Sequence, residues 1–381
     1  MPAAAAEPTL DIDGLLGDQR TRIIVCCGAG GVGKTTIAAS LGLRAAEAGR
    51  RVVVLTIDPA RRLAQSLGLS ELDNTPRPVS GFDTSAGGTL DAMMLDMKRT
   101  FDEVVEAHAT PEKAQQILAN PFYQAVSSSF AGTQEYMAME KLGQLHRQAL
   151  ADGSHDLIVV DTPPSRSALD FLDAPERLSS FLDGRFIRLL LAPARGPARL
   201  MTAGFSVVTN ALTKVLGAQV LRDMQTFVAA FDTLFGGFRQ RAEQTFALLQ
   251  ADGTAFVVIA APEPDALREA AYFVDRLTDD DMPLAGLVVN RASPSARTEL
   301  SAEEAITAAD RLRSGDSSSL TAGLLRLHAD RVRVIEREQH LRERFAAAHP
   351  HVPTAVVPAM ASDVHDLDGL RAIGESLSRQ E

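Results

Sequence analysis

A glycine-rich segment that ends in lysine and threonine directly follows the first apolar run of the chain. It fits the pattern G-x-x-x-x-G-K-[ST], in which glycines let the backbone curl until successive N–H groups face phosphate oxygens. The lysine would reach the β- and γ-phosphates of ATP, and the first threonine hydroxyl would ligate Mg²⁺. The segment therefore predicts a Mg-ATP site, formed by Gly28, Ala29, Gly30, Gly31, Val32, Gly33, Lys34, Thr35 and Thr36.

The same glycines also fit a different kind of site. Gly28, Gly30 and Gly33 match the G-x-G-x-x-G turn of dinucleotide-binding oxidoreductases. Asp58 ends the next apolar run, where such an enzyme places the acid that binds the ribose. This alternative has no use for the lysine-threonine pair that follows the glycines, whereas phosphoryl transfer requires both residues.

A second acidic residue favours the phosphate-loop interpretation. Asp161 ends another apolar run, in the segment LIVVDTPP. Phosphate-loop enzymes place an aspartate at this position of a strand to assist Mg²⁺ binding beside the loop threonine, here Thr35. We therefore expect an ATP hydrolase with Lys34 at the phosphates, Thr35 and Asp161 at the metal, and ATP and Mg²⁺ as its cofactors.

Six short apolar runs rich in β-branched residues predict the strands that position these groups. Most are continuously hydrophobic, as strands covered on both faces must be, and the first five each precede a turn and a helical pattern. These features predict an α/β fold with a mostly parallel sheet flanked by helices, with Leu90–Met97 as a further strand. The six runs are Arg22–Cys27, Arg51–Thr56, Leu157–Val160, Ala255–Ala260, Leu284–Val289 and Thr354–Val357.

Helical patterns fill the two longest gaps between these runs and predict a helical subdomain inserted into a nucleotide-binding core. Within the last part of the core, Ser293–Ser319 is polar and predicts a loop-rich excursion before a long charged helix at about 320–348. We expect a mobile N-terminal arm at 1–20, core segments at 21–98, 151–174 and 251–381, and a helical insert in two parts at 99–150 and 175–250.

Composition argues against several classes of function. A net charge of −11 over 381 residues argues against nucleic acid as a partner, because nucleic-acid binding uses a basic face. Cys26 and Cys27 are adjacent, so on a strand they point to opposite faces and predict neither a disulfide nor a shared metal. The N-terminus has no basic region of the secretory type, and the most apolar long stretch, Ala203–Leu221, is interrupted by Asn210 and Lys214. We expect a cytoplasmic protein.

Four segments in order make the sequence similar to a known family. The chain resembles the ArsA/guided-entry family of dimeric phosphate-loop ATPases, which includes the arsenite-pump ATPase and the ATPase that targets tail-anchored proteins. The stretches LDMKRTFDEVV and AGTQEYMAME are similar to an actinobacterial-type anion-transporting ATPase branch. The four segments are Gly28–Thr36, TIDPARRL (Thr56–Leu63), DTPPSRSALDFLDAP (Asp161–Pro175) and VPAMASDVHDLDGL (Val357–Leu370).

This resemblance implies a deviant Walker A fold and a role for four residues. Asp58 would be catalytic, because it lies in the first switch, where the family's aspartate orients or activates the attacking water. Asp161 would open the second switch and contact Mg²⁺ through water. Asn290, in an Asn-Arg step after the fifth run, would read adenine, and Pro358 would help to close over the base.

The departures from the family pattern concern hydrolysis and activation. Family loops read GKGGVGKT, and the first lysine reaches across the dimer to the partner's phosphates, but this chain has Ala29 there. Hydrolysis is then weak, or Arg61, Arg62 or Arg166 supplies the charge, or a paralogous partner carries the lysine; we favour a paralogous heterodimer over a homodimer. Ser167 replaces the usual histidine of the second switch, and the thiols that bind metalloids in relatives are missing, so activation by arsenite is not expected.

The resemblance also implies what the ATP cycle serves. Binding and hydrolysis would drive a conformational cycle of two subunits, for membrane-protein targeting or a membrane-associated transport process, with a membrane-protein client or membrane component as partner. A stripe with Met224, Phe227 and Phe231 could line a client groove in the helical insert, or pack against neighbouring helices. The alternative function is a nucleotide-gated regulatory or structural dimer with little turnover.

Overall fold

The computed structural model describes residues 8–58, 62–121, 123–124, 127, 133–163, 237, 240–294, 300–312 and 319–380. In this part of the chain one sheet of eight strands has the order β3-β4-β2-β5-β1-β6-β7-β8. All neighbouring strands are parallel except β3 and β4. The strands are β1 (Ile23–Gly28), β2 (Arg51–Thr56), β3 (Arg77–Pro78), β4 (Thr89–Met94), β5 (Leu157–Asp161), β6 (Thr254–Ala260), β7 (Leu284–Ala292) and β8 (Thr354–Pro358).

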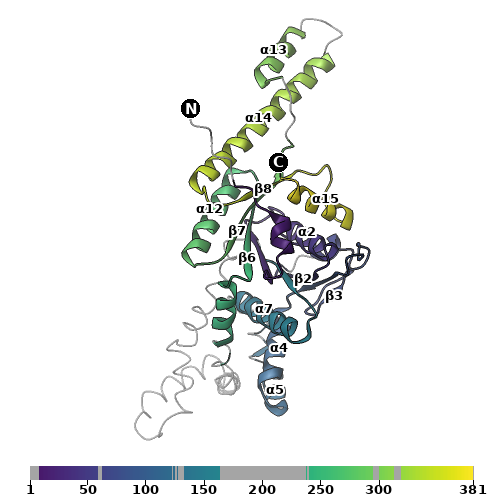
Figure 1. Cartoon of the computed structure of the whole chain (residues 1–381), viewed down its shortest axis with the longest axis vertical. Helices are drawn as coiled ribbons and strands as arrows, with labels where there is room; N and C mark the ends of the chain where they lie inside the picture. The colour runs from purple at the N-terminus through teal and green to yellow at the C-terminus, as the bar shows by residue number, and fades with distance from the viewer. Residues whose placement is uncertain are drawn as a thin grey trace, which may run out of the picture.

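Helices cover both faces of this sheet (Figure 1). The described helices are α1 (Ile12–Gly17), α2 (Lys34–Glu47), α3 (Arg62–Ser66), α4 (Met97–His108), α5 (Pro111–Leu118), α7 (Thr133–Asp152), α12 (Pro264–Asp279), α13 (Ala302–Leu312), α14 (Ser319–Ala348) and α15 (Leu367–Ser378). The prediction of a mostly parallel α/β sheet flanked by helices is confirmed. All six expected runs and the extra segment near Leu90 form strands.

The alternation of side chains along β1 divides the core into two layers. Ile23, Val25 and Cys27 face the layer that α7 and α12 cover, whereas Ile24 and Cys26 face the layer of α2 and α15. The two cysteines are free and fully buried on opposite faces, as their adjacency predicts. Burial raises the pKa of the Cys26 thiol, and it raises the pKa of Cys27 to about 12, so both are unreactive thiols.

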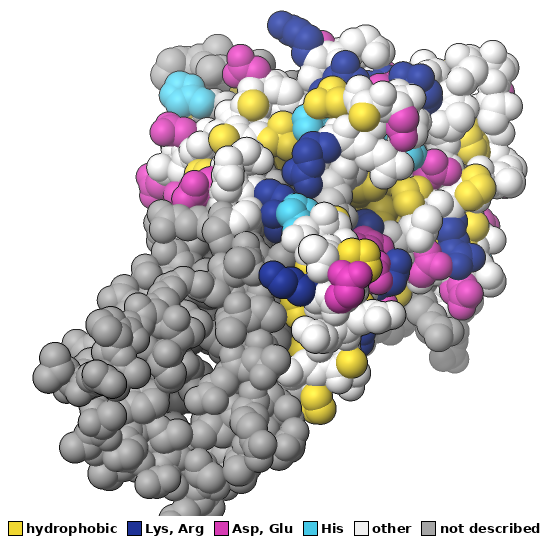
Figure 2. All heavy atoms as spheres, turned by 90° about the horizontal axis from the view of Figure 1, so that it is seen from below, with side chains coloured by type: hydrophobic (Ala, Val, Ile, Leu, Met, Phe, Trp, Pro, Cys, Tyr) yellow, Lys and Arg dark blue, Asp and Glu magenta, His cyan; other side chains and the backbone are white. Residues whose placement is uncertain are grey.

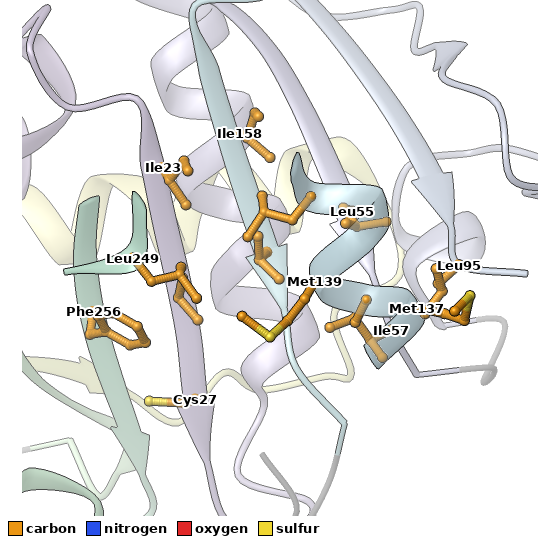
Figure 3. Packing of buried hydrophobic residues seen from close by; sticks show 14 of the residues in the cluster. Ile23, Cys27, Leu55, Ile57, Leu95, Met137, Met139, Ile158, Leu249 and Phe256 are labelled. Atoms are coloured by element: carbon orange, nitrogen blue, oxygen red, sulfur yellow. The ribbon is translucent and has the colours of Figure 1, made fainter. Parts of the chain in front are cut away.

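Helix α7 packs directly on the sheet, although residues 99–150 were expected to belong to a separate insert. Met137 and Met139 of α7 lie in the same core cluster as Leu55 of β2 and Ile158 of β5, and Figure 3 shows Met139 in front of β5 and Met137 beside Leu95. The first part of the expected insert therefore shares the core of the sheet. Residues 175–250 lie almost entirely outside the described residues, as does the stripe with Met224, so the division into core and insert stays a prediction.

The N-terminal segment differs from the expected mobile arm over residues 8–20. Thr9 pairs with Thr354 at the edge of the sheet, and Asp11 caps α1 by accepting a hydrogen bond from the Gly14 N–H at 2.8 Å. Ile12 and Leu16 of α1 are buried in the core layer that contains α2 and α15. The expectation was wrong for this stretch because three apolar side chains, Leu10 among them, anchor it.

The segment Ser293–Ser319 also contains a helix that the expectation of a loop-rich excursion missed. Helix α13 packs against α14, with Ala305 and Ala329 at the contact, and the two helices extend away from the sheet as a hairpin (Figure 1). The small alanine side chains allow close approach of the two helices. The long charged helix itself, α14, is confirmed.

Two further observations concern the surface of the molecule. Among the described residues, no helix combines the length and hydrophobicity needed to cross a bilayer; Ala203–Leu221 lies outside those residues. On the described part of the face drawn in Figure 2, basic side chains are interspersed with acidic ones and form no continuous stripe.

Candidate nucleotide site

The carboxyl ends of three neighbouring strands bring the predicted site residues together. Strand β5 lies between β1 and β2, so Asp161 at its end pairs in register with Cys26 on one side and Thr56 on the other. The glycine-rich loop follows β1, and Asp58 follows β2. In parallel α/β sheets, ligands bind outside the carboxyl ends of the strands, and this site has that location.

The phosphate loop has a backbone that only glycine adopts without strain at several positions. Gly28, Gly31 and Gly33 have φ angles of 149°, 78° and 95°. A Cβ on Gly28 would lie 2.1 Å from the Ile259 carbonyl oxygen, and one on Gly33 would lie 2.3 Å from the Asn290 amide nitrogen. The loop is therefore fixed in its curled form by both backbone angle and close packing, directly before the N-terminus of α2.

Lys34 lies inside this loop rather than in open solvent. Its side-chain Nζ donates a hydrogen bond to the Ala29 carbonyl at 2.9 Å, and the residue is only 6% exposed. Burial lowers the pKa of the ammonium, while the charges of Asp161 and Asp58 oppose that shift. The loop therefore curls around its own lysine and holds it in place.

Asp161 is the most buried charged group of the site. Its Oδ2 accepts hydrogen bonds from the Thr35 hydroxyl at 2.7 Å and the Thr56 hydroxyl at 2.8 Å. Burial raises the pKa of this carboxyl to about 6, although both hydroxyls and Lys34 oppose the rise. Its Oδ1 is buried and has no hydrogen-bond partner in the described structure.

The unsatisfied Oδ1 tests whether the site fits a magnesium ion. A buried carboxylate oxygen without a donor costs about 1–3 kcal/mol or more, so such an oxygen is rare outside functional sites. The water shell of Mg²⁺ would supply the missing donors, and the hydroxyl of Thr35 is an oxygen ligand that this ion accepts. Thr35 and Asp161 therefore fit the metal that the sequence predicted for them.

Asp58 lies next to these groups at a half-buried position. Its backbone N–H donates to the Thr56 hydroxyl oxygen at 3.2 Å, which ties the residue to the hydroxyl that Asp161 binds. Its carboxylate is close enough to influence the pKa values of Lys34 and Asp161. The arrangement places an acceptor for a water proton beside the phosphate loop.

Asn290 and its neighbour contact the loop from β7. The Asn290 Nδ2 donates to the Val32 carbonyl at 2.8 Å, and the residue is 5% exposed. Arg291 donates through Nη1 to the Gly31 carbonyl at 3.0 Å. Pro358 ends β8, whose residue Val357 pairs with Asn290, so the two predicted base-contacting residues lie on adjacent strands.

A small cavity of about 170 Å³ opens beside Pro358 at the same sheet edge. Its lining comes from the ends of β7 and β8 and from α14, and includes Ala292, Ser293, Glu338 and Arg342. Glu338 accepts hydrogen bonds from the Ser293 N–H at 2.7 Å and the Ser293 hydroxyl at 2.8 Å, so α14 fixes the segment that leaves β7. This places α14 against the edge of the proposed base site.

The structure brings together nearly all residues that the sequence singled out, and it adds two. Thr56 and Arg291 belong to segments already noted, TIDPARRL and the Asn-Arg step, but their contacts were not expected. A hydroxyl at the last position of a strand was the only signal for Thr56. Arg62 is exposed at the start of α3, whereas Arg61, Arg166 and Ser167 lie outside the described residues.

Comparison with known proteins gives a consistent result. Residues 21–310 match the family model described as anion-transporting ATPase. The chain is 28% identical over 190 residues to a protein of Aquifex aeolicus named as arsenical pump-driving ATPase 1, covering 48% of this chain and 45% of that protein. It is 24% identical over 283 residues to ATPase get3 of Schizosaccharomyces japonicus, covering 74% and 77%, and 30% identical over 178 residues to ATPase GET3 of Malassezia globosa, covering 47% and 49%.

Proposed function

The chain belongs to the anion-transporting ATPase family, a family of ATP hydrolases, and on this premise we propose that its phosphate loop binds Mg-ATP and that hydrolysis drives a conformational cycle of two subunits. The observation that carries the proposal is Asp161. A buried carboxylate that accepts from the loop threonine and keeps one oxygen without a donor is the partner that a hydrated metal beside a triphosphate requires.

Each residue of the site then has a separate task. When bound, Mg²⁺ would neutralise charge on the β- and γ-phosphate oxygens. The loop N–H groups and Lys34 bind the phosphates, since the ammonium has two N–H donors besides the one on the Ala29 carbonyl. Thr35 and Asp161 hold the metal and its water. Asp58 accepts a proton from the attacking water or orients it, and that water therefore needs a place between Asp58 and the γ-phosphate.

The base would bind between the ends of β7 and β8. Asn290 uses its amide nitrogen on Val32, and in the described structure no hydrogen bond reaches its Oδ1. That oxygen is the acceptor that the amino group of adenine needs. Pro358 offers an apolar ring to the face of the base. Gly28 to Thr36, Asn290 and Pro358 thus form the proposed nucleotide-binding residues.

The partner and the purpose of the cycle are further parts of the proposal. The name of one relative, arsenical pump-driving ATPase, and the resemblance to the guided-entry family support a cytoplasmic ATPase that serves a membrane-protein client or a membrane component. A nucleotide-gated dimer with little turnover is the second candidate, and Ala29 in place of the family lysine favours it. Proteins that co-purify with the chain in ADP and in a non-hydrolysable ATP analogue should differ if a client exchanges during the cycle; an identical set in both would contradict the targeting role.

Substitution of Lys34 tests the site itself. Lys34→Ala should lower Mg-ATP hydrolysis by roughly a hundredfold or more, because it removes a cation that stabilises the transferring phosphoryl group. The fold should remain, since the buried ammonium gives up only its bond to Ala29. Lys98→Ala, at an exposed lysine of α4 paired with Asp102, is the control and should retain full activity. Parent-level hydrolysis by the Lys34 variant would remove this loop as the active site.

A further inference from the structure

Two consecutive residues at the end of β7 hydrogen-bond two consecutive carbonyls of the phosphate loop. Asn290 binds the carbonyl of Val32 at 2.8 Å, and Arg291 binds the carbonyl of Gly31 at 3.0 Å. The Asn290 side chain is buried, whereas that of Arg291 lies at the surface. The two contacts differ in setting but act on adjacent peptide groups of the same loop.

Because the peptide bond is planar, these contacts with carbonyl groups also orient the N–H groups on the opposite side of the loop. In a planar trans peptide the C=O and N–H groups point in opposite directions. Holding the Gly31 carbonyl therefore fixes the direction of the Val32 N–H, and holding the Val32 carbonyl fixes the direction of the Gly33 N–H. These N–H groups belong to the part of the loop that faces phosphate oxygens.

The backbone of Arg291 supports a functional reason for this contact. Arg291 has a φ angle of 61°, and among the described residues Asp281 is the only other non-glycine residue with a positive φ. Side-chain-bearing residues are disfavoured in this region, and such strain persists where the surrounding structure and function require it. A glycine would fit the backbone better at position 291 but could not reach Gly31.

We propose that Asn290 and Arg291 form a two-point clamp that pre-orients the Val32 and Gly33 N–H groups for the phosphates, with Arg291 as a positioning residue. This inference rests on the proposed Mg-ATP site. The clamp acts before the nucleotide arrives, so it lowers the cost of ordering the loop on binding. It also connects the base side of the site, at the end of β7, with the phosphate side. Arg291 contacts the carbonyl side of the loop and is not a catalytic residue.

Replacement of Arg291 by glycine distinguishes an effect on nucleotide affinity, which the clamp predicts, from an effect on the stability of the fold. In the full chain, Arg291→Gly should raise the Kd for Mg-ATP and Mg-ADP roughly tenfold, the effect of losing about 1.4 kcal/mol from one charge-assisted hydrogen bond. The KM should rise with little change in kcat, because ground state and transition state lose the same contact. The Tm without nucleotide should stay constant or rise, since glycine relieves the backbone strain.

Asp281→Gly is the matched control, because this exposed residue has a φ angle of 53° and follows α12 before β7 begins. It should show the same or higher Tm and an unchanged Kd. Arg291→Lys, which keeps a cationic donor, should recover part of the lost affinity. An unchanged Kd in Arg291→Gly overturns the proposal, and so does a Tm that falls together with the affinity.

The failure of the clamp and the failure of the proposed function give different results. If Lys34→Ala also binds Mg-ATP as tightly as the parent, the proposed site is wrong. If Lys34→Ala loses binding while Arg291→Gly does not, only the clamp is wrong.

Inorganic tripolyphosphate, measured by competition with a fluorescent ATP analogue, then tests the Asn290 half of the clamp. Asn290→Ala should weaken the binding of both tripolyphosphate and ATP, and that of ATP more, because ATP also loses the proposed contact with adenine. A loss confined to ATP would make Asn290 a reader of the base alone and would overturn its part in the clamp.

Discussion

The charge of the buried Asp161 carboxylate lowers the stability of the folded protein when no metal is bound. The pKa of Asp161 in the folded chain is about 6, above the value of 3.8 for an ordinary aspartate, because the residue is buried. An acid with a raised folded pKa contributes most to stability below pH 3.8, and this contribution is lost as pH rises through about 6. The charge that the site needs for Mg²⁺ therefore opposes folding at neutral pH.

Substitution of Asp161 by asparagine makes this cost measurable. With EDTA present, Asp161→Asn should have a higher free energy of unfolding than the parent above pH 6, by up to about 3 kcal/mol for a shift of about two pH units. This difference in the free energy of unfolding should become smaller between pH 6 and pH 4, as the parent carboxyl becomes protonated. Urea unfolding at a series of pH values measures the difference. A variant that is less stable than the parent at pH 7 would contradict the assignment of a strained, metal-requiring carboxylate.

Asp58 differs from Asp161 in that its proposed task is chemical. Asp58→Asn should keep the Kd for Mg-ATP within about threefold of the parent and lower kcat by roughly a hundredfold, the contribution of one general base. The amide cannot take a proton from water, although it keeps the size of the side chain. Equilibrium binding with ATP and single-turnover hydrolysis separate the two quantities. Hydrolysis at the parent rate would exclude Asp58 from the mechanism.

The residues of the site were predictable to different extents. The phosphate loop, Asp58 and Asp161 carry their function in local spacing, so the sequence alone identifies them. Thr56 could not be identified in this way, because its role depends on β2 and β5 being neighbours, and strand order is a property of the assembled sheet. The same holds for the contact of Arg291 with Gly31, which joins residues 260 positions apart.

Among the helices and strands, α1 and the chain that follows it are fixed by a buried arginine at the amino ends of the strands, on the side of the sheet away from the site. Arg50 precedes β2, and its side chain is 2% exposed. Its guanidinium donates to the Asp156 carboxylate at 2.7 Å and to the backbone carbonyls of Leu16, Asp18 and Thr21 at 2.9, 3.1 and 2.8 Å. One planar fork of donors therefore connects the N-terminal segment to the starts of two strands.

Substitution of this arginine should affect stability without affecting the chemistry of the site. Arg50→Met should destabilise the chain by about 3–5 kcal/mol, because Asp156 Oδ1 and the carbonyls of Leu16 and Thr21 lose this buried donor. Activity per folded molecule should be unchanged, since the site lies at the carboxyl ends of the strands. Arg51→Met is the control, because the side chain of this neighbour is 49% exposed and its Nε lies 3.4 Å from the same carboxylate, so its loss should cost about 1 kcal/mol or less. Equal destabilisation by both variants would show that burial of Arg50 is not the reason.

The elements that the sequence missed are those with few residues or few apolar positions. Strand β3 has two residues, one of them Pro78, so no apolar run indicates it. The six-residue α1 and the alanine-rich α13 are short, but each has a capping signal. Asp11 caps the first, and Ser301 exchanges hydrogen bonds with Glu304 at the start of the second. Continuous apolar strands, in contrast, were placed within a few residues because burial on both faces leaves them no polar positions.

The assembly of the whole molecule bears on Ala29, which stands where the family has a lysine in an otherwise complete site. This residue is 8% exposed, and its carbonyl holds Lys34, so the position has a structural contact within its own chain. The family resemblance assigns the side chain at this position to the partner's phosphates. A homodimer of this chain would lack that cation in both sites. A heterodimer with a lysine-bearing paralogue would lack it only in the partner's site and would keep this chain's own site complete.

ATP hydrolysis by the purified chain and its Ala29 variants distinguishes these two assemblies. If the missing lysine limits turnover, the purified chain alone should hydrolyse ATP slowly, and Ala29→Lys should raise kcat by roughly a hundredfold, the value of one transition-state cation. Ala29→Met is the matched control, because it adds a side chain of similar length without charge and should give no increase. Brisk hydrolysis by the unaltered chain that Arg62→Ala abolishes would instead show that an arginine at the start of α3 supplies the charge, and a paralogous partner would then be unnecessary. A slow parent that Ala29→Lys activates would show that the missing lysine limits turnover, which is the condition that a lysine-bearing paralogous partner would meet.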